Sequence, residues 1–267
     1  TTRLVGSEMC IRDRYITMLI IVCPLVFLAG FVDAVAGGGG LISLPAYIFA
    51  GVPIHVAYGT NKFANSIGTA VAASKFFKSG NIKLKPAILS AIGAIIGSWF
   101  GAKLVLILDE KYLHYCLMII LPIVSVFLLF NRSFGSLEEE KEITKGKLYI
   151  LSLIIGFIIG GYDGFFGPGT GTFLVLAFTS LLGFSLITAS GNAKVVNLAS
   201  NVGALMAYIF SSKVSFAIGI PAAVCSIAGN YIGAHLAVKN GAKFIKPIIL
   251  LVVGMLFIKV ILGFFDL

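Results

Sequence analysis

The chain has 267 residues, of which 58% are hydrophobic and only 12% are charged, and its mean hydropathy is +1.03. This composition supplies too few polar residues to cover a soluble globule, which excludes a soluble catalytic or binding domain. The net charge of +9 could indicate a nucleic-acid partner, but the lysines cluster between apolar runs, as the positive-inside bias of membrane proteins predicts. We therefore expect an all-α polytopic protein of the cytoplasmic membrane that contacts the lipid bilayer and no nucleic acid.

Residues 1–14 need separate treatment. The stretch from Val5 to Arg14 resembles translated sequencing-adapter DNA, so we expect residues 1–14 to be non-native or disordered. A genuine short polar amino terminus is the alternative. Arg12 and Arg14 before an apolar run also mimic a signal peptide, but no small-residue cleavage site followed by polar sequence comes after them.

Apolar runs divide the rest of the chain into predicted helices. The first run, 15–50, is interrupted by glycines at 37–40, and it predicts a helix, a glycine turn and a shorter returning arm. The charged segment 132–147 is the predicted linker between a first membrane repeat (15–131) and a second (148–267). The remaining predicted elements are helices at about 56–77, 86–108 and 111–130, a second broken run at 148–182, and helices at about 186–210, 216–238 and 242–265.

The two halves match position by position. At an offset of 130 residues (163 − 33), the first break falls on the second: Asp33 on Asp163, Gly37 on Gly167 and Gly39 on Gly169. At an offset of 132 (194 − 62), Lys62 falls on Lys194 and Asn65 on Asn197. Such a small change of offset is expected of diverged duplicates. We predict two homologous repeats, each a glycine-broken hairpin plus three transmembrane helices.

The positions of the lysines predict how the repeats are oriented. Basic loops occur at 78–85, in the linker and at 239–246. If each broken run folds back as a re-entrant hairpin, three crossings remain in each half and all three basic loops lie on one side. If each run crossed the membrane once, the last loop would lie opposite the others. The positive-inside rule therefore favours inverted repeats.

The glycine breaks and the recurring lysines form the candidate site. A carboxylate at membrane depth costs about 2.5–3.5 kcal/mol, and each glycine weakens a helix by about 1 kcal/mol, so a function is expected to justify them. Paired broken helices in two halves are the best sequence indication of a transporter's substrate site. The predicted substrate-binding residues offer an ammonium group, amides and helix amino ends to a small anion: Gly37, Gly38, Gly39, Asn61, Lys62, Asn65, Gly167, Gly169, Asn192, Lys194 and Asn197.

Asp33 and Asp163 are predicted to couple anion movement to protons. An aspartate that loses its lysine partner to an incoming anion would take up a proton more readily. Three structural interpretations compete with this one: tight glycine bends with a structural Asp, lysines that snorkel to the interface, and mutual neutralisation of Asp33 with Lys62 and of Asp163 with Lys194.

Other features indicate structure and not chemistry. Three glycine pairs four residues apart, Gly97–Gly101, Gly156–Gly160 and Gly229–Gly233, have the spacing of close helix packing in membranes. The four cysteines and three histidines show no paired or ligand spacing, so we infer neither a disulfide nor a metal site. We find no P-loop, zinc-protease helix or nucleophile elbow, and therefore expect no cofactor and no enzymatic activity.

The acid with its glycine run, the motif Gly59-Thr-Asn-Lys62 ending in Asn65, and their second copies resemble the sulfite exporter family of TauE/SafE-type permeases, from about residue 16 onward. The second copy departs from the first by reading Gly191-Asn-Ala-Lys194. The resemblance implies a small, duplicated, polytopic permease that moves sulfite, sulfonates or related small sulfur-containing anions across the cytoplasmic membrane. A passive anion channel, a transporter of another small organic anion, a membrane-embedded enzyme and a structural subunit remain alternatives, and a homo-oligomer is possible.

Overall fold

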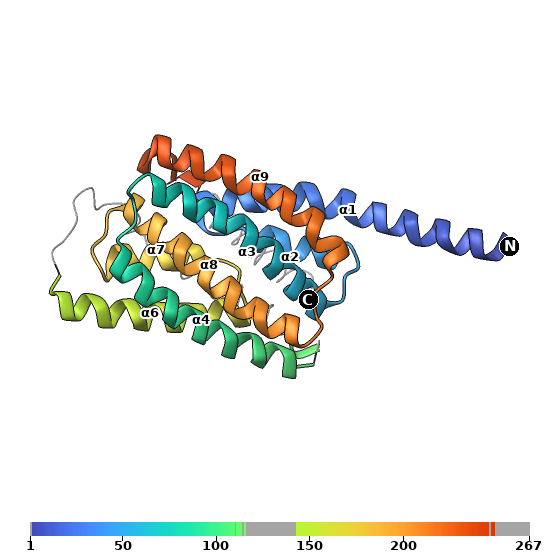
Figure 1. Ribbon diagram of the computed structural model, residues 1–267, viewed down its shortest axis with the longest axis horizontal. Coiled ribbons are helices and arrows are strands. Elements are labelled where there is room, and N and C mark those ends of the chain that lie inside the picture. Colours follow the sequence, from blue (N-terminus) through green and yellow to red (C-terminus); the bar gives the residue numbers. More distant parts are fainter. Residues whose placement is uncertain (1, 110, 114, 116–142, 246, 249–267) are drawn as a thin grey trace.

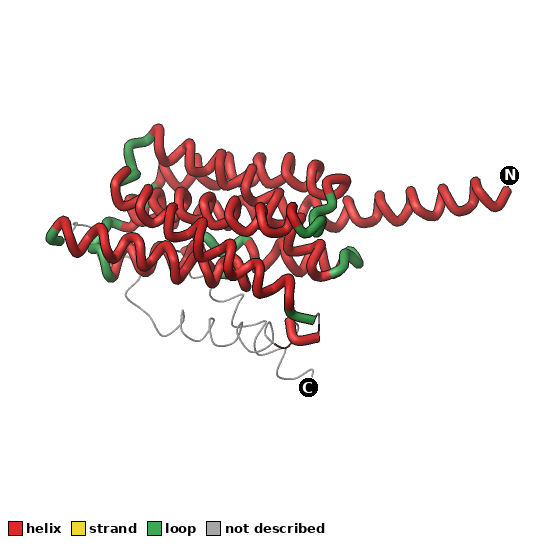
Figure 2. The backbone as a smooth tube through the Cα atoms, turned by 60° about the horizontal axis from the view of Figure 1, so that its bottom comes forward, coloured by secondary structure: helices red, strands yellow, loops and turns green. Residues whose placement is uncertain are grey.

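The computed structural model describes residues 2–109, 111–113, 115, 143–245 and 247–248, with side chains from Arg14 onward. Within these ranges the chain is helical and contains no strand, which confirms the predicted all-α class. Figures 1 and 2 show helices that run roughly along one common direction. They are α1 (Thr2–Ala36), α2 (Gly40–Phe49), α3 (Ile54–Lys78), α4 (Leu84–Ile107), α6 (Lys145–Phe165), α7 (Thr170–Ser180), α8 (Leu186–Phe210) and α9 (Phe216–Asn240).

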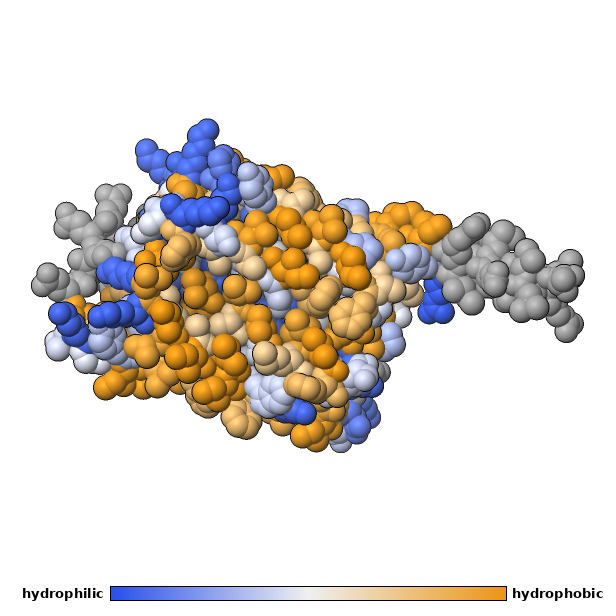
Figure 3. Space-filling view, viewed as in Figure 1, coloured by the Kyte–Doolittle hydropathy of each residue, from blue (hydrophilic) through white to orange (hydrophobic). Residues whose placement is uncertain are grey.

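Five of the described helices are long and apolar enough to cross a bilayer: α1 from Arg14 onward, α4, α6, α8 and α9. Their outward faces carry large apolar residues, and Figure 3 shows these across the broad middle of the molecule, with hydrophilic residues gathered mainly towards one end. Such a surface suits hydrocarbon and not water, so the protein is a membrane protein.

The predicted helices at 56–77, 86–108, 186–210 and 216–238 are confirmed as α3, α4, α8 and α9, within a few residues at each end. The predictions for 111–130 and 242–265 lie largely outside the described residues. Helix α1 begins at Thr2, so residues 2–14 form its first turns. That these residues are non-native stays a prediction.

Glycines break both long apolar runs where predicted. Between α1 and α2, Gly37 has φ 80°, and between α6 and α7, Gly167 and Gly169 have φ 86° and 84°, a left-handed conformation that glycine adopts at little cost. After the first break the chain turns back along α1, because Gly51, just beyond α2, lies beside the side chain of Arg14. The shorter returning arm is therefore confirmed for the first run.

The described helices sort into two bundles, each built from both sequence halves. The first bundle packs α1, α2 and α3 with α9, and the second packs α6, α7 and α8 with α4. In each bundle one helix, α9 or α4, comes from the other half of the chain, and glycines let it pack closely. A Cβ on Gly229 of α9 would clash with the Phe27 carbonyl of α1, and a Cβ on Gly97 of α4 would clash with the Phe157 carbonyl of α6. This confirms the packing role predicted for the glycine pairs. Helices α3 and α8 make the main contact between the bundles.

Polar side chains are concentrated inside the molecule on α3 and α8. Buried polar groups need partners, so these two helices must find hydrogen bonds or ion pairs in the interior. The buried polar residues are Thr60, Asn61, Lys62, Ser66 and Thr69 on α3, and Ser190, Asn192, Lys194, Asn197, Ser200 and Asn201 on α8.

Candidate functional site

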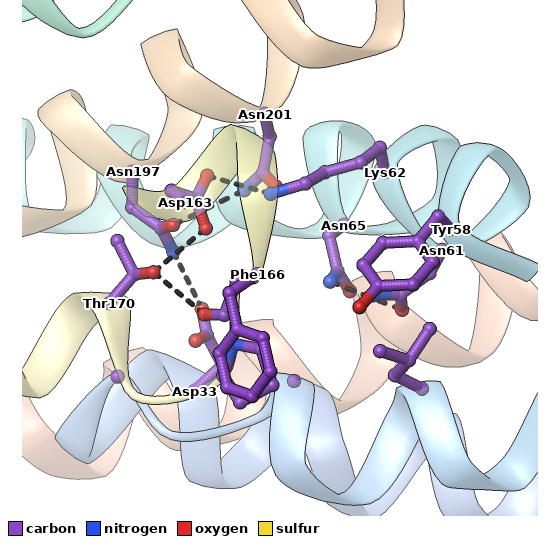
Figure 4. Close-up of a pocket in the computed structure, with 15 residues that line it drawn as sticks. Asp33, Tyr58, Asn61, Lys62, Asn65, Asp163, Phe166, Thr170, Asn197 and Asn201 are labelled. Atoms are coloured by element: carbon purple, nitrogen blue, oxygen red, sulfur yellow. Dashed lines mark hydrogen bonds and ion pairs between the residues drawn. The ribbon is translucent and has the colours of Figure 1, made fainter. Parts of the chain in front are cut away.

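A cavity of about 20 Å³ lies between the bundles, where the two glycine breaks meet (Figure 4). Its walls combine charged groups, amides and the backbone of the breaks. The lining residues are Asp33, Gly37, Gly40, Leu44, Tyr58, Asn61, Lys62, Asn65, Asp163, Phe166, Gly167, Pro168, Thr170, Asn197 and Asn201.

The two breaks touch each other directly. The amide of Gly171 donates to the carbonyl of Gly37 at 3.0 Å, and Thr172 Oγ1 donates to the carbonyl of Ala36 at 2.8 Å. A Cβ on Gly37 would overlap the backbone of Gly171, so this approach requires glycine. The carbonyl of Ala36, the last residue of α1, and that of Gly37 therefore accept hydrogen bonds from the other half of the chain. Because α2 and α7 begin here, their positive amino ends face the cavity.

Asp163 is enclosed by three donors. Lys62 Nζ from α3 lies 2.7 Å from Asp163 Oδ2, and Ser200 Oγ from α8 donates to the same oxygen at 2.6 Å. Thr170 Oγ1, at the start of α7, donates to Asp163 Oδ1 at 2.9 Å. The side chain of Asp163 is 3% exposed and that of Lys62 5%. A buried pair with additional hydrogen bonds compensates for much of the water that both charges lose.

Asp33 has fewer and longer contacts. Lys194 Nζ lies 3.6 Å from Asp33 Oδ2 and also donates to the Asp33 backbone carbonyl. Asn197 Nδ2, one turn further along α8, donates to Asp33 Oδ2 at 3.2 Å. The side chain of Asp33 is 16% exposed, whereas that of Lys194 is 1% exposed. Asp33 therefore faces the cavity more openly than Asp163.

The pairing anticipated from sequence, Asp33 with Lys62 and Asp163 with Lys194, is wrong. Each lysine binds the acid of the other half, Lys62 that of Asp163 and Lys194 that of Asp33. The physical reason is the helix arrangement: α3 and α8 meet at the bundle interface, so each lysine reaches across it to the opposite broken helix.

Two amide pairs complete the lining. Asn65 Nδ2 donates to Asn61 Oδ1 at 3.3 Å on α3, and Asn201 Nδ2 donates to Asn197 Oδ1 at 3.3 Å on α8. Residues four apart lie on one helical face, so both pairs turn towards the same cavity. The amides supply donors and acceptors without charge.

The structure brings most of the residues predicted from sequence to the cavity and places five elsewhere. Those in the lining are Asp33, Gly37, Asn61, Lys62, Asn65, Asp163, Gly167 and Asn197. Gly38, Gly39, Gly169, Asn192 and Lys194 are not part of it.

Local contacts explain most of the displaced positions. Gly39 packs on Ala29 and Asp33 of α1, and Gly169 forms the left-handed start of α7. Asn192 Nδ2 donates back to the Thr188 carbonyl of its own helix. Lys194 is directed at Asp33, so it reaches the cavity through that residue.

Sequence reasoning missed several lining residues and one supporting donor. Ser200 and Asn201 follow Asn197 by three and four residues, so extending the face of Asn197 by one turn would have found them. Tyr58 precedes Lys62 by one turn and could have been found in the same way. Thr170 carries no such signal, since its hydroxyl reaches Asp163 only because the chain reverses at the break.

The described residues contain no cluster of three or more His, Cys, Asp or Glu side chains that could hold a metal ion. The chemistry on offer is instead that of ammonium groups, amides, hydroxyls and helix amino ends, which suits a small anion once the carboxylate charge is offset.

Comparison with known proteins identifies relatives over almost the whole chain. A family model described as "Sulfite exporter TauE/SafE" matches residues 22–260. The chain is 35% identical to "Probable membrane transporter protein YfcA" of Escherichia coli, covering 89% of this chain and 87% of that one. It is 32% identical to "Probable membrane transporter protein ORF9" of Sinorhizobium sp (90% and 91%) and 32% identical to a "Probable membrane transporter protein" of Haemophilus influenzae (93% and 96%). No solved structure matches.

Proposed function

This chain belongs to the sulfite exporter TauE/SafE family of membrane transporters, and we propose that it is a secondary transporter of sulfite, sulfonates or related small sulfur-containing anions. The observation that carries the proposal is a cavity at the meeting of two broken helices, bordered by two lysine–aspartate pairs and four asparagines. Intramembrane ionisable groups facing a cavity mark a substrate or ion pathway. The site is the family's substrate site in this proposal.

Equivalent contacts in the two halves support a duplicated architecture. Gly97 meets Phe157 in the α4–α6 contact, and Gly229 meets Phe27 in the α1–α9 contact. Phe157 is the counterpart of Phe27 at the offset of 130, and Gly229 that of Gly97 at 132. The same contact therefore occurs twice with the halves exchanged.

Helix directions support inversion of the repeats. Since Phe27 meets Gly229 and Phe31 meets Gly233, α1 runs parallel to α9; the contact of Gly219 with Phe63, and of Gly68 with Ser226, makes α3 parallel to α9 as well. By the same reasoning α6 runs parallel to α4. Because α4 follows α3 through a short turn and runs in the opposite direction, α1 and α6 are antiparallel (Figure 1).

The two bundles are the bodies that would move. Both ion pairs cross the bundle interface: Lys62 of α3 with Asp163 of α6, and Lys194 of α8 with Asp33 of α1. A cavity of about 20 Å³ has room for about one water molecule, so a sulfur oxyanion enters only when the bundles separate on one side. Separation on alternate sides gives alternating access around this site.

When the anion binds, it takes the place of an aspartate carboxylate as the partner of a lysine in the site. Lys62, together with Asn61, Asn65, Asn197 and Asn201, offers donors to it, and the amino ends of α2 and α7 add a favourable field. Proton uptake by a released aspartate keeps the charge of the buried site balanced, which links transport to a proton gradient.

Flux through purified protein in lipid vesicles tests the proposal. Sulfite and methanesulfonate uptake should exceed that of empty vesicles, should saturate with concentration, and should proceed against an anion gradient when a pH gradient is imposed. Uptake that only follows the anion gradient would indicate a passive channel. Equal uptake by vesicles with and without the protein would contradict the transporter itself.

A further inference from the structure

Asp33 and Asp163 are equivalent in sequence, but their partners lie on different sides of the bundle interface. Asp163 of α6 is held by Ser200 of α8 and Thr170 of α7, which belong to its own bundle. Lys62 of α3 is its partner from the other bundle. When the bundles separate, Asp163 therefore keeps two donors that stabilise its charge.

Asp33 of α1 is held entirely from across the interface by the described residues. Lys194 and Asn197, which bind its carboxylate, are both on α8 of the second bundle. In the first half of the chain, the positions equivalent to Thr170 and Ser200 are Gly40 and Gly68, which have no side chain that could donate a hydrogen bond to Asp33. Separation of the bundles would therefore leave Asp33 without these partners, and its side chain is already 16% exposed.

We propose that Asp33 is the exchangeable carboxylate of the site, that Asp163 stays ionised as a fixed partner of Lys62, and that one proton accompanies each monovalent anion in the same direction. This proposal rests on the proposed function. With both lysines charged and both aspartates ionised, the empty site is neutral. With Asp33 protonated and a monoanion bound, it is neutral again, so neither form moves net charge across the membrane.

The other titratable groups around Asp33 fit this division. Lys194 faces it from α8, Lys62 and Tyr58 line the same cavity from α3, and Asp163 lines it from α6. Among the described residues, α2, α7 and α9 contribute no titratable side chain to the lining. Asp163 has Ser200 and Thr170 of its own bundle as donors, which leaves Asp33 as the carboxylate that loses its described partners when the interface opens.

Vesicle flux with methanesulfonate, which stays a monoanion over the working pH range, tests the stoichiometry. A pH gradient should drive uptake with one proton per anion, and a potassium–valinomycin potential without a pH gradient should not. Asp33→Asn should keep exchange of labelled for unlabelled anion and lose the stimulation by the pH gradient. Asp109→Asn, at the exposed end of α4, is the charge-matched control and should behave as the parent. Potential-driven uptake, or an Asp33→Asn variant still driven by pH, would overturn the proposal.

Infrared difference spectroscopy on acidification separates this proposal from the transport function, because it needs no flux. The chain has 11 Asp and Glu residues, so the spectra are compared between variants. One protonated-carboxyl component should be present in the parent, in Asp109→Asn and in the double variant Lys62→Met/Asp163→Asn, which removes both members of the second pair together, and that component should be missing in Asp33→Asn. An Asp33→Asn spectrum that keeps every carboxyl component of the parent, or loss of that component in the double variant, would overturn the assignment even if no anion is transported.

Discussion

Helices meet in two different ways in this protein, within the bundles and between them. Within the bundles, α4 packs on α6 and α1 on α9 through glycines that bring backbones together, and the contact is made of carbonyls, amides and methylene groups. Between the bundles, α3 and α8 present lysines, asparagines and a stacked pair of tyrosines, Tyr58 and Tyr208, with ring centroids 6.5 Å apart.

We therefore expect the contacts within each bundle to be rigid and the contacts between the bundles to be the ones that change during transport. Close backbone packing depends on shape and has no charge that a ligand could change. Ion pairs at the bundle interface depend on the protonation and ligation of a few groups, so a proton and an anion can weaken them. In the proposed mechanism the two bundles therefore move relative to each other while the packing within each bundle stays intact.

The largest expected effect comes from filling a contact within a bundle. In Gly97→Leu the Cβ alone would run into the Phe157 carbonyl, and the rest of the side chain has no space. Overpacking costs about 1–3 kcal/mol where neighbouring side chains can shift. Here the clash is with backbone that cannot shift without separating α4 from α6, so we expect a larger cost than that of a broken ion pair, and little folded protein. Fluorescence-detected size-exclusion chromatography of membranes measures this.

Gly146→Leu is the matched control, because a Cβ at Gly146 meets nothing within 4 Å. It should express and elute as the parent does. A Gly97→Leu variant with normal expression and transport would mean that the α4–α6 contact is not the tight one that the structure indicates.

Removing one charge between the bundles should cost less than Gly97→Leu, but still a great deal. Lys62→Met leaves Asp163 buried with only Ser200 and Thr170 as donors, and breaking a buried pair costs about 3–5 kcal/mol. We expect a lower melting temperature and no anion uptake. Lys62→Met/Asp163→Asn should regain part of the stability, since no unpaired charge remains, but not the uptake. Normal uptake by Lys62→Met would show that this lysine serves packing alone.

The sequence predicted the parts of this site that depend on one helix at a time. Apolar runs located the helices, the glycine runs located both breaks, and the repeat singled out the lysines and aspartates. It could not predict the crossed pairs, because the partner of Lys62 is set by the contact of α3 with helices of the other half. The proximity of the Cys23 and Cys225 thiols was missed for the same reason: one is on α1, the other on α9, and 202 residues (225 − 23) separate them.

A smaller effect should distinguish the two aspartates by their donors. Ser200→Ala removes a hydrogen bond within the second bundle, which costs about 1.5–3 kcal/mol when the acceptor is charged. Asn197→Ala removes a longer bond to Asp33 across the interface. We expect Ser200→Ala to lower the melting temperature more, and Asn197→Ala to alter the dependence of uptake on the pH gradient more. Thermal denaturation and vesicle flux on both variants provide the test, and the opposite ranking in both measurements would contradict it.

The smallest effect on transport is expected from a covalent link within a bundle. Phe27 meets Gly229 and Phe31 meets Gly233, so the register of α1 on α9 puts Cys23 opposite Cys225 one turn earlier, where both are free, partly buried thiols. With Cys10 and Cys116 replaced by Ser, copper-catalysed oxidation by oxygen should join them, which a mass loss of two hydrogens would record. In the proposed mechanism α1 and α9 move together, so anion uptake should stay at the parent rate. The contrasting link lies between the bundles. Tyr58→Cys/Tyr208→Cys in a chain without other cysteines is bridged by a short bis-methanethiosulfonate, which forms a disulfide with each thiol and releases methanesulfinate. This bridge should stop uptake until a reductant cleaves the disulfides. If the Cys23–Cys225 disulfide stops uptake as the bridge between α3 and α8 does, then α1 and α9 slide past each other during transport, and the glycine contact between them is a moving surface.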